Sequence, residues 1–159
     1  MKIDILCVGK IKEKFYDDAL KEYLKRLSRY ARVSLVEVKD EKTQEGASEH
    51  EDELVLQKEG ERLEKYIEDD AYIIALCIEG QQATSTEFAD IITSIENSGK
   101  SHIQFIIGGS LGIDKDIKKR SDMRLSFSKM TFPHQLMRVI LLEQVYRAYR
   151  IKNNEPYHK

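Results

Sequence analysis

Short apolar runs rich in β-branched residues alternate with amphipathic helical patterns along the whole chain, and this alternation limits the possible folds most strongly. In the first helical pattern, Phe15, Ala19, Tyr23 and Leu27 recur at intervals of four residues. The runs that we expect to be strands are residues 3–8, 33–38, 72–78, 103–107 and 123–127. Alternation of this kind predicts an α/β fold with one mainly parallel sheet of about five strands, flanked by helices.

Local signals predict where the helices begin and end. Ser48 with Glu51, and Thr84 with Glu87, have the spacing of a capping box and should start helices that end near residues 67 and 97. Pro133 is expected at the first position of the longest helix, which ends near residue 152. The other expected segments are a loop over 40–47, a turn at 79–80, a short helix over 114–120 and a tail over 153–159 of a usually disordered kind. The positions expected to face inward on the helices are Phe15, Leu54, Leu63, Ile67, Phe88, Ile91, Ile92, Ile95, Leu136, Ile140, Val145 and Ala148.

The size and composition are those of an ordinary globular domain. With 159 residues, 41% of them hydrophobic, the chain is expected to form a single domain over residues 1–159. It has no transmembrane run and no signal peptide, so we expect a cytoplasmic protein without a membrane partner. Cys7 and Cys77 are expected to be buried core residues, since a disulfide is rare in a reducing compartment. No metal site is expected, because neither cysteine belongs to a Cys/His cluster, and His50 and His102 are expected at the surface.

The net charge of −2 hides an uneven distribution along the chain. Acidic residues dominate 39–70, whereas basic residues dominate 10–32 and 129–159. A polyanionic partner such as a nucleic acid would therefore meet the two basic segments. The simpler alternative is that these charges only solvate helix faces.

Three segments follow the carboxyl ends of expected parallel strands, where α/β proteins hold ligands. They are residues 76–80, the glycine-rich 108–112 (GGSLG) and 127–132. The glycines would let backbone approach a ligand, although a simple tight turn gives the same pattern. The chain lacks the dinucleotide-binding GxGxxG, the P-loop GxxxxGK[ST] and the hydrolase GxSxG.

Longer motifs identify a family. GGSLG after IQFII, then LSFSKMTFPHQLMRVILLEQVYRAYRI, and the terminal EPYHK resemble the SPOUT-class family of ribosomal RNA large subunit methyltransferase H, over the whole chain. The resemblance implies a SPOUT α/β-knot fold, in which a C-terminal trefoil knot threads the last helix through a loop. It also implies a homodimer that uses S-adenosyl-L-methionine to methylate N3 of a pseudouridine in 23S rRNA, in the large subunit or the assembled ribosome.

The resemblance also assigns residues. It implies that Leu76, Gly108 and the residues Phe127, Ser128, Lys129, Met130, Thr131 and Phe132 contact the cofactor. The catalytic candidates are His134, Arg138, Tyr157 and His158. Arg138 is expected to stabilise the ring anion or a phosphate, and the Tyr157–His158 tail to pack at the pocket, across the dimer.

Simpler roles stay open for these residues. Met130 and Phe132 are also suited to core packing, and His134 is suited to capping its helix. Surface acids are suitable partners for Arg138, Arg147 and Arg150. Two other functions remain as well, an RNA-binding module that has lost catalysis and a methyltransferase that acts on tRNA.

Overall fold

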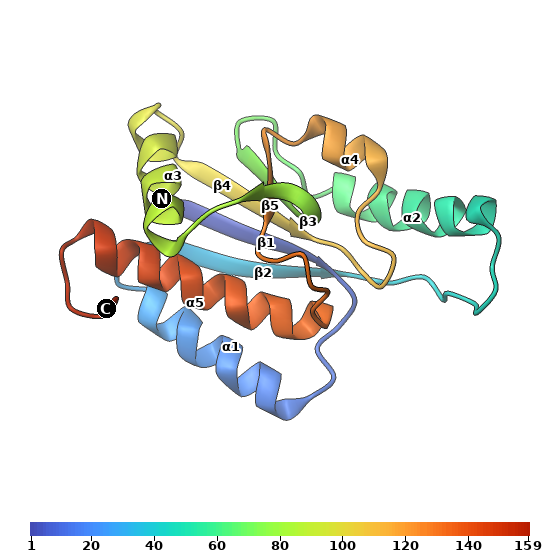
Figure 1. The fold of residues 1–159 in the computed structure, drawn as a ribbon, viewed down its shortest axis with the longest axis horizontal. Helices are drawn as coiled ribbons and strands as arrows, with labels where there is room; N and C mark the ends of the chain where they lie inside the picture. Colours follow the sequence, from blue (N-terminus) through green and yellow to red (C-terminus); the bar gives the residue numbers. More distant parts are fainter.

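The computed structural model describes all of residues 1–159 as one sheet between two layers of helices (Figure 1). The strands are β1 (Lys2–Val8), β2 (Arg32–Val38), β3 (Tyr72–Gln82), β4 (His102–Ile107) and β5 (Met123–Ser126). The helices are α1 (Lys14–Leu27), α2 (Glu49–Glu64), α3 (Ser85–Asn97), α4 (Lys115–Arg120) and α5 (His134–Lys152). All strand pairs are parallel, in the order β2-β1-β4-β3-β5, which confirms the predicted five-stranded parallel sheet.

Each face of the sheet is covered by its own helices. Alternating residues of β1 divide between the two faces: Ile3 and Ile5 join a core with α1, α3 and α5, whereas Leu6 and Val8 join a second core with α2 and α4. Helix α5 contacts both α1 and α3, so it forms the middle of its layer. None of the helices is both long and apolar enough to cross a membrane.

Strand β3 is longer than predicted. It continues through Glu79 and Gly80, where a turn was expected, and ends at Gln82. Its pairing with β5 shifts register between Leu76 and Gln81, so the residues between them bulge out of the ladder. A side chain on Gly80 would lie 2.8 Å from the backbone of β5, so only glycine permits this close crossing of two chain segments.

Two residues predicted to face inward are exposed instead. Leu54, on the first half of α2, is 43% exposed, and Phe15, in the first turn of α1, is 63% exposed. The Phe15 ring packs against Tyr16, with ring centroids 4.4 Å apart, instead of entering the core.

Smaller differences concern caps and cysteines. Thr84 and Glu87 form the predicted capping box, and the Ser48 hydroxyl accepts a hydrogen bond from the Glu51 N–H. Pro133 precedes α5 as its N-cap, so His134 is the first helical residue. Both cysteines are free; Cys7 is buried as predicted, but Cys77 is only half-buried because it lies at the irregular part of β3.

Candidate active site

The irregular part of β3 and the loops that follow β4 and β5 line an open cavity of about 310 Å³. Eight of the residues assigned from the sequence line it: Leu76, Gly108, Phe127, Ser128, Met130, Thr131, Phe132 and His134. Lys129 is exposed and lies outside the lining. The lining also includes Cys77 to Glu79 and Gly109 to Gly112, from two of the segments expected to hold a ligand. It further includes Ile113, Lys118 and Met137, which the sequence analysis did not single out.

The glycine-rich turn brings backbone to the cavity wall. A side chain on Gly108 would overlap the carbonyl group of Gly112, and Gly112 itself has a φ of +92°. The N–H of Gly112 donates to the carbonyl of Gly109 at 3.1 Å, which closes the turn. The motif is therefore a tight turn, and it also places backbone polar groups at the cavity.

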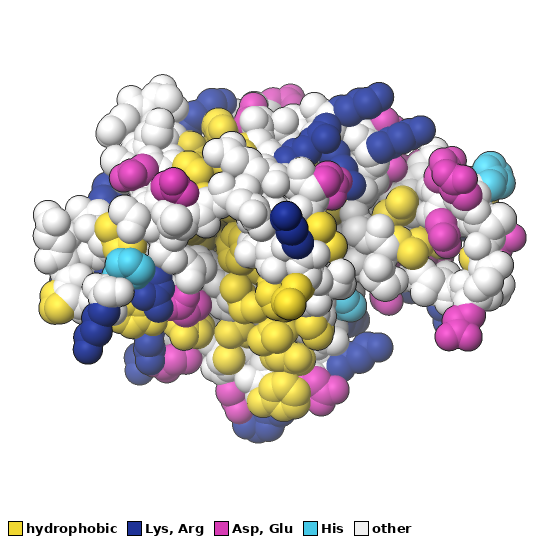
Figure 2. Space-filling model, viewed as in Figure 1, with side chains coloured by type: hydrophobic (Ala, Val, Ile, Leu, Met, Phe, Trp, Pro, Cys, Tyr) yellow, Lys and Arg dark blue, Asp and Glu magenta, His cyan; other side chains and the backbone are white.

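Hydroxyl groups hold the 127–132 loop in shape on the opposite wall. Ser126 Oγ donates to the carbonyl of Ser128 at 3.0 Å, and Ser128 Oγ accepts from the N–H of Met130 at 2.9 Å. Met130 is 74% exposed, which excludes the alternative that it packs in the core. Hydrophobic side chains gather on the lower middle of the face drawn in Figure 2, in the region of α5 and α1.

His134 places an ionisable side chain on the cavity. It is the first residue of α5, and its Nε2 atom lies 3.6 Å from where a Gly9 side chain would begin. Burial and the nearby positive charge of Arg138 lower the pKa of His134 from its usual value. The imidazole is therefore neutral at neutral pH, which is the form that can accept a proton.

Arg138 is fully buried and does not line the cavity. Its guanidinium donates to Glu37 Oε2 at 2.7 Å, and to the carbonyl oxygens of Val8 and Gly9 at 3.1 and 2.8 Å. It thus joins α5 to the carboxyl ends of β1 and β2. Of the two catalytic candidates on α5, the structure brings only His134 to the cavity surface.

The C-terminal tail folds back on α5, although its composition is typical of a disordered segment. Tyr157 donates to Glu143 at 3.0 Å, and Arg147 donates to His158 Nδ1 at 3.1 Å. The Arg147 guanidinium also lies over the Tyr157 ring, 4.7 Å from its centroid. Burial and the Glu143 carboxylate raise the pKa of Tyr157 to about 12, so its phenol stays protonated.

Arg147 therefore has more contacts than the sequence analysis expected. It pairs with Glu143 on its own helix, as a surface arginine would, and it also holds the tail. The only sequence signal was the Glu143–Arg147 spacing of four residues. Arg147 follows His134 by thirteen residues of α5, which is about 20 Å of helix. The tail does not reach the cavity of its own chain.

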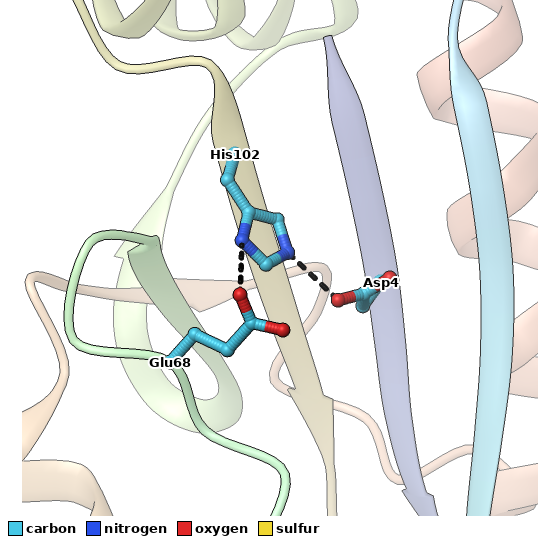
Figure 3. Close-up of side chains that lie close together, drawn as sticks. All are labelled: Asp4, Glu68 and His102. Carbon is cyan, nitrogen blue, oxygen red and sulfur yellow. Dashed lines mark hydrogen bonds and ion pairs between the residues drawn. The ribbon is translucent and has the colours of Figure 1, made fainter.

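The amino end of the sheet holds the other cluster of ionisable groups (Figure 3). His102 is buried, where a surface position was predicted, because its Nε2 lies 2.7 Å from Asp4 Oδ2 on the adjacent strand. Its Nδ1 faces Glu68 Oε2 at 3.4 Å. These three groups are close enough to hold one metal ion, but Asp4 and His102 already bind each other and Lys2 pairs with Glu68. The cluster acts as a link between β1, β4 and the segment after α2.

Comparisons with known proteins agree with this arrangement. A family model described as "Predicted SPOUT methyltransferase" matches residues 1–158. The chain is 60% identical to ribosomal RNA large subunit methyltransferase H of Bifidobacterium adolescentis and 54% identical to that of Clostridium kluyveri, over the full length of all three chains.

A solved structure of a probable methylase family protein from Haemophilus influenzae has the same fold. It matches with a TM-score of 0.56 and 12% identity, over 99% of this chain and 70% of that one. The expected trefoil knot is consistent with the family. The chain belongs to the SPOUT methyltransferase family.

Proposed function

We propose that this protein transfers a methyl group from S-adenosyl-L-methionine to N3 of a pseudouridine in 23S rRNA, in the cytoplasm and on the assembled ribosome. One observation carries the proposal: three segments far apart in the sequence, assigned to the cofactor from motifs alone, meet on a single cavity. The relatives named as large subunit rRNA methyltransferases support the choice of substrate.

The cavity suits an adenosyl ligand in size and chemistry. Its volume of about 310 Å³ lies at the lower end of the range for small-molecule sites. Leu76, Phe127 and Phe132 offer apolar surface for a purine, and the backbone of Gly108 offers polar groups for its edges. When bound, S-adenosyl-L-methionine supplies a methyl group that its positively charged sulfur has already activated.

The protein's own groups must then position the base and remove one proton. The N3 proton of a uracil ring is comparable in acidity with that of a phenol, whose pKa is about 10. His134 is neutral and lies on the cavity, so it can accept this proton. Arg138 acts indirectly in this proposal, because its charge lowers the pKa of His134 and its hydrogen bonds fix the adjoining strand ends.

A complete site requires a second copy of the chain. The Tyr157–His158 tail lies about 20 Å along α5 from His134, so a tail that acts at the reaction must come from the partner of a homodimer. Phe15 and Met130 are exposed hydrophobic side chains, which a partner would cover. Exposed Lys129 is then placed to meet RNA phosphates.

The test is methyl transfer from labelled S-adenosyl-L-methionine to ribosomes that lack the modification, with the labelled nucleotide then mapped. We expect label at N3 of one 23S pseudouridine. His134→Gln should lower the rate about 100-fold. Because the pKa of His134 is lowered, wild-type kcat/KM should fall only at a pH below the ordinary histidine pKa of about 6.5. His50→Gln, on the exposed surface of α2, is the matched control and should have no effect.

Other outcomes would contradict the proposal in distinguishable ways. A protein that binds the methyl donor but labels no ribosome would be an RNA-binding module. Label found on tRNA would change the substrate but keep the reaction. Full activity in His134→Gln would contradict only the role of the imidazole and would leave the proposed reaction unchanged.

A further inference from the structure

Glu59 is a buried carboxylate with an unused oxygen atom. It lies near the end of α2 and is 4% exposed. Its Oε2 accepts a hydrogen bond from the N–H of Glu41 at 3.0 Å, whereas its Oε1 is buried without any partner. A buried acceptor left in this state costs free energy, so a protein that retains one gains something else from it.

The carboxylate lies against the glycine turn of the cavity. A Cβ atom on Gly109 would lie 3.4 Å from Glu59 Oε2 and 3.5 Å from Oε1, and 3.1 Å from Val8. The Glu59 carboxylate therefore lies within van der Waals reach of the turn at Gly109. The backbone N–H of Ser110 donates no hydrogen bond within the chain, whereas the N–H of Gly109 faces Gly112 across an isolated antiparallel bridge. An unused acceptor, Glu59 Oε1, and an unused donor, the Ser110 N–H, thus belong to the same turn region beside the cavity.

Gly60, the residue after Glu59, also brings helix α2 close to the chain beside this turn. A Cβ atom on Gly60 would lie 2.9 Å from the Cβ atom of Asp114, so Gly60 lets the helix pack directly on the segment that follows the turn. Three residues after Glu59, Arg62 donates to the carbonyl oxygen of Lys39 at 2.8 Å. Helix α2 therefore holds both the loop after β2 and the glycine turn after β4, with Glu59 between them.

We propose that Glu59 is a positioning residue of the cofactor pocket. Its Oε1 accepts a hydrogen bond from the Gly109–Ser110 backbone when an adenosyl ligand occupies the cavity, and this bond fixes the turn in its ligand-bound shape. The carboxylate does not line the cavity, so it acts through the turn and does not touch the ligand. The inference rests on the proposed use of an adenosyl cofactor.

The test is equilibrium binding of S-adenosylhomocysteine, measured by titration calorimetry on the whole protein. Glu59→Gln keeps the shape and one acceptor, so the Glu41 contact and the fold should survive while the second acceptor is lost. We expect the Kd to rise about tenfold, with KM for the methyl donor rising equally and kcat at saturating donor changing less than about threefold. Glu61→Gln, exposed on the same helix, should leave all three values unchanged.

A second variant distinguishes positioning from a general loss of structure. Gly109→Ala places a methyl group against the carboxylate and should also weaken binding about tenfold. If both changes disrupt one contact, the double variant should bind no more than about threefold more weakly than either single variant.

Fully additive losses in the double variant would overturn the inference, and so would an unchanged Kd in folded Glu59→Gln. A wild-type protein that does not bind S-adenosylhomocysteine would instead overturn the proposed cofactor itself.

Discussion

The two ends of the sheet consist of the same strands but differ in how completely their polar groups are paired. At the amino end, the Asp4 carboxylate accepts from Ser34, interacts with His102 and accepts from Gln104. Gln104 also donates to the carbonyl oxygen of Tyr66 and accepts from the N–H of Glu68. The buried groups of this end satisfy one another, and such a network fixes a structure without offering a site.

At the carboxyl end, buried polar atoms remain without partners beside a cavity. Three buried side-chain atoms in the protein have no partner, and two of them, Glu59 Oε1 and Arg138 Nε, lie at this end. The third, Arg150 Nε, lies where the tail folds back on α5. The difference indicates that the amino end stabilises the fold, whereas the carboxyl end and the tail keep groups available for binding.

The largest loss of stability should follow Arg138→Ala. The change leaves the Glu37 carboxylate and two strand-end carbonyl groups without their buried donor. Removing one partner of a buried ion pair costs about 3–5 kcal/mol, and the partial exposure of Glu37 favours the lower value. Denaturant unfolding measures this loss. A change below about 1 kcal/mol would mean that the carboxyl end does not depend on this link.

Gly108→Ala should have the next largest effect. Its methyl group would overlap the Gly112 carbonyl, so the turn must shift. We expect the protein to lose about 2–3 kcal/mol of stability and to bind the methyl donor about 100-fold more weakly. Gly99→Ala is the control at the amino end. Gly99 also has a positive φ, +91°, but no atom lies near its missing side chain. It should cost only about 1 kcal/mol of strain and leave donor binding unchanged, as titration calorimetry can show.

The sequence predicted the elements well because hydrophobic periodicity is a local property. The five strands, the parallel sheet and the inward faces of α3 all follow from it. The length of β3 does not, because residues beyond Gly80 stay extended only by crossing β5, which lies more than forty residues later. The burial of His102 likewise depends on Asp4, which is 98 positions away in the chain.

The sequence predicted which loops form the candidate site but not how their side chains are arranged. Motifs identified the loops that line the cavity, yet they grouped Arg138 with His134, which are four residues apart on one helix. The structure keeps the two side chains near each other but gives them different surroundings, because the Arg138 guanidinium binds the strand ends whereas the His134 side chain lines the cavity. Glu59 was not predicted at all, since it lies in an acidic helix where charges usually face solvent.

Asp4→Asn should cost about 1–3 kcal/mol, because an amide cannot replace all of the acceptor roles of the carboxylate. Burial alone would raise the pKa of Asp4, but hydrogen bonds from Ser34, His102 and Gln104 outweigh it and lower the pKa. Ionised Asp4 therefore stabilises the fold above its unfolded pKa of about 3.9, and this contribution is lost as the pH falls through the lowered folded value.

Unfolding of wild type and variant at several pH values measures this contribution. The difference in unfolding free energy between wild type and Asp4→Asn should be largest at neutral pH and should disappear in acid. Donor binding by the folded variant should match that of wild type. Weakened binding would contradict the view that the amino end is purely structural.

The smallest loss of stability should follow removal of residues 156–159. Their contacts with Glu143 and Arg147 lie partly in solvent, so the cost should stay below about 1 kcal/mol. Methyl transfer should nevertheless fall about 100-fold, because the tail is proposed to complete the site of the partner chain. A truncated protein with full activity would show that the tail is expendable.

Mixed dimers can show in which chain the tail acts. In a dimer of a truncated chain and a His134→Gln chain, the truncated chain keeps its imidazole and its partner keeps the tail. If the tail acts across the dimer, one complete site forms, and an equal mixture should recover about a quarter of wild-type activity, since about half of the dimers are mixed. If the tail acts on its own chain, no site in the mixture is complete and activity stays at the level of the separate variants.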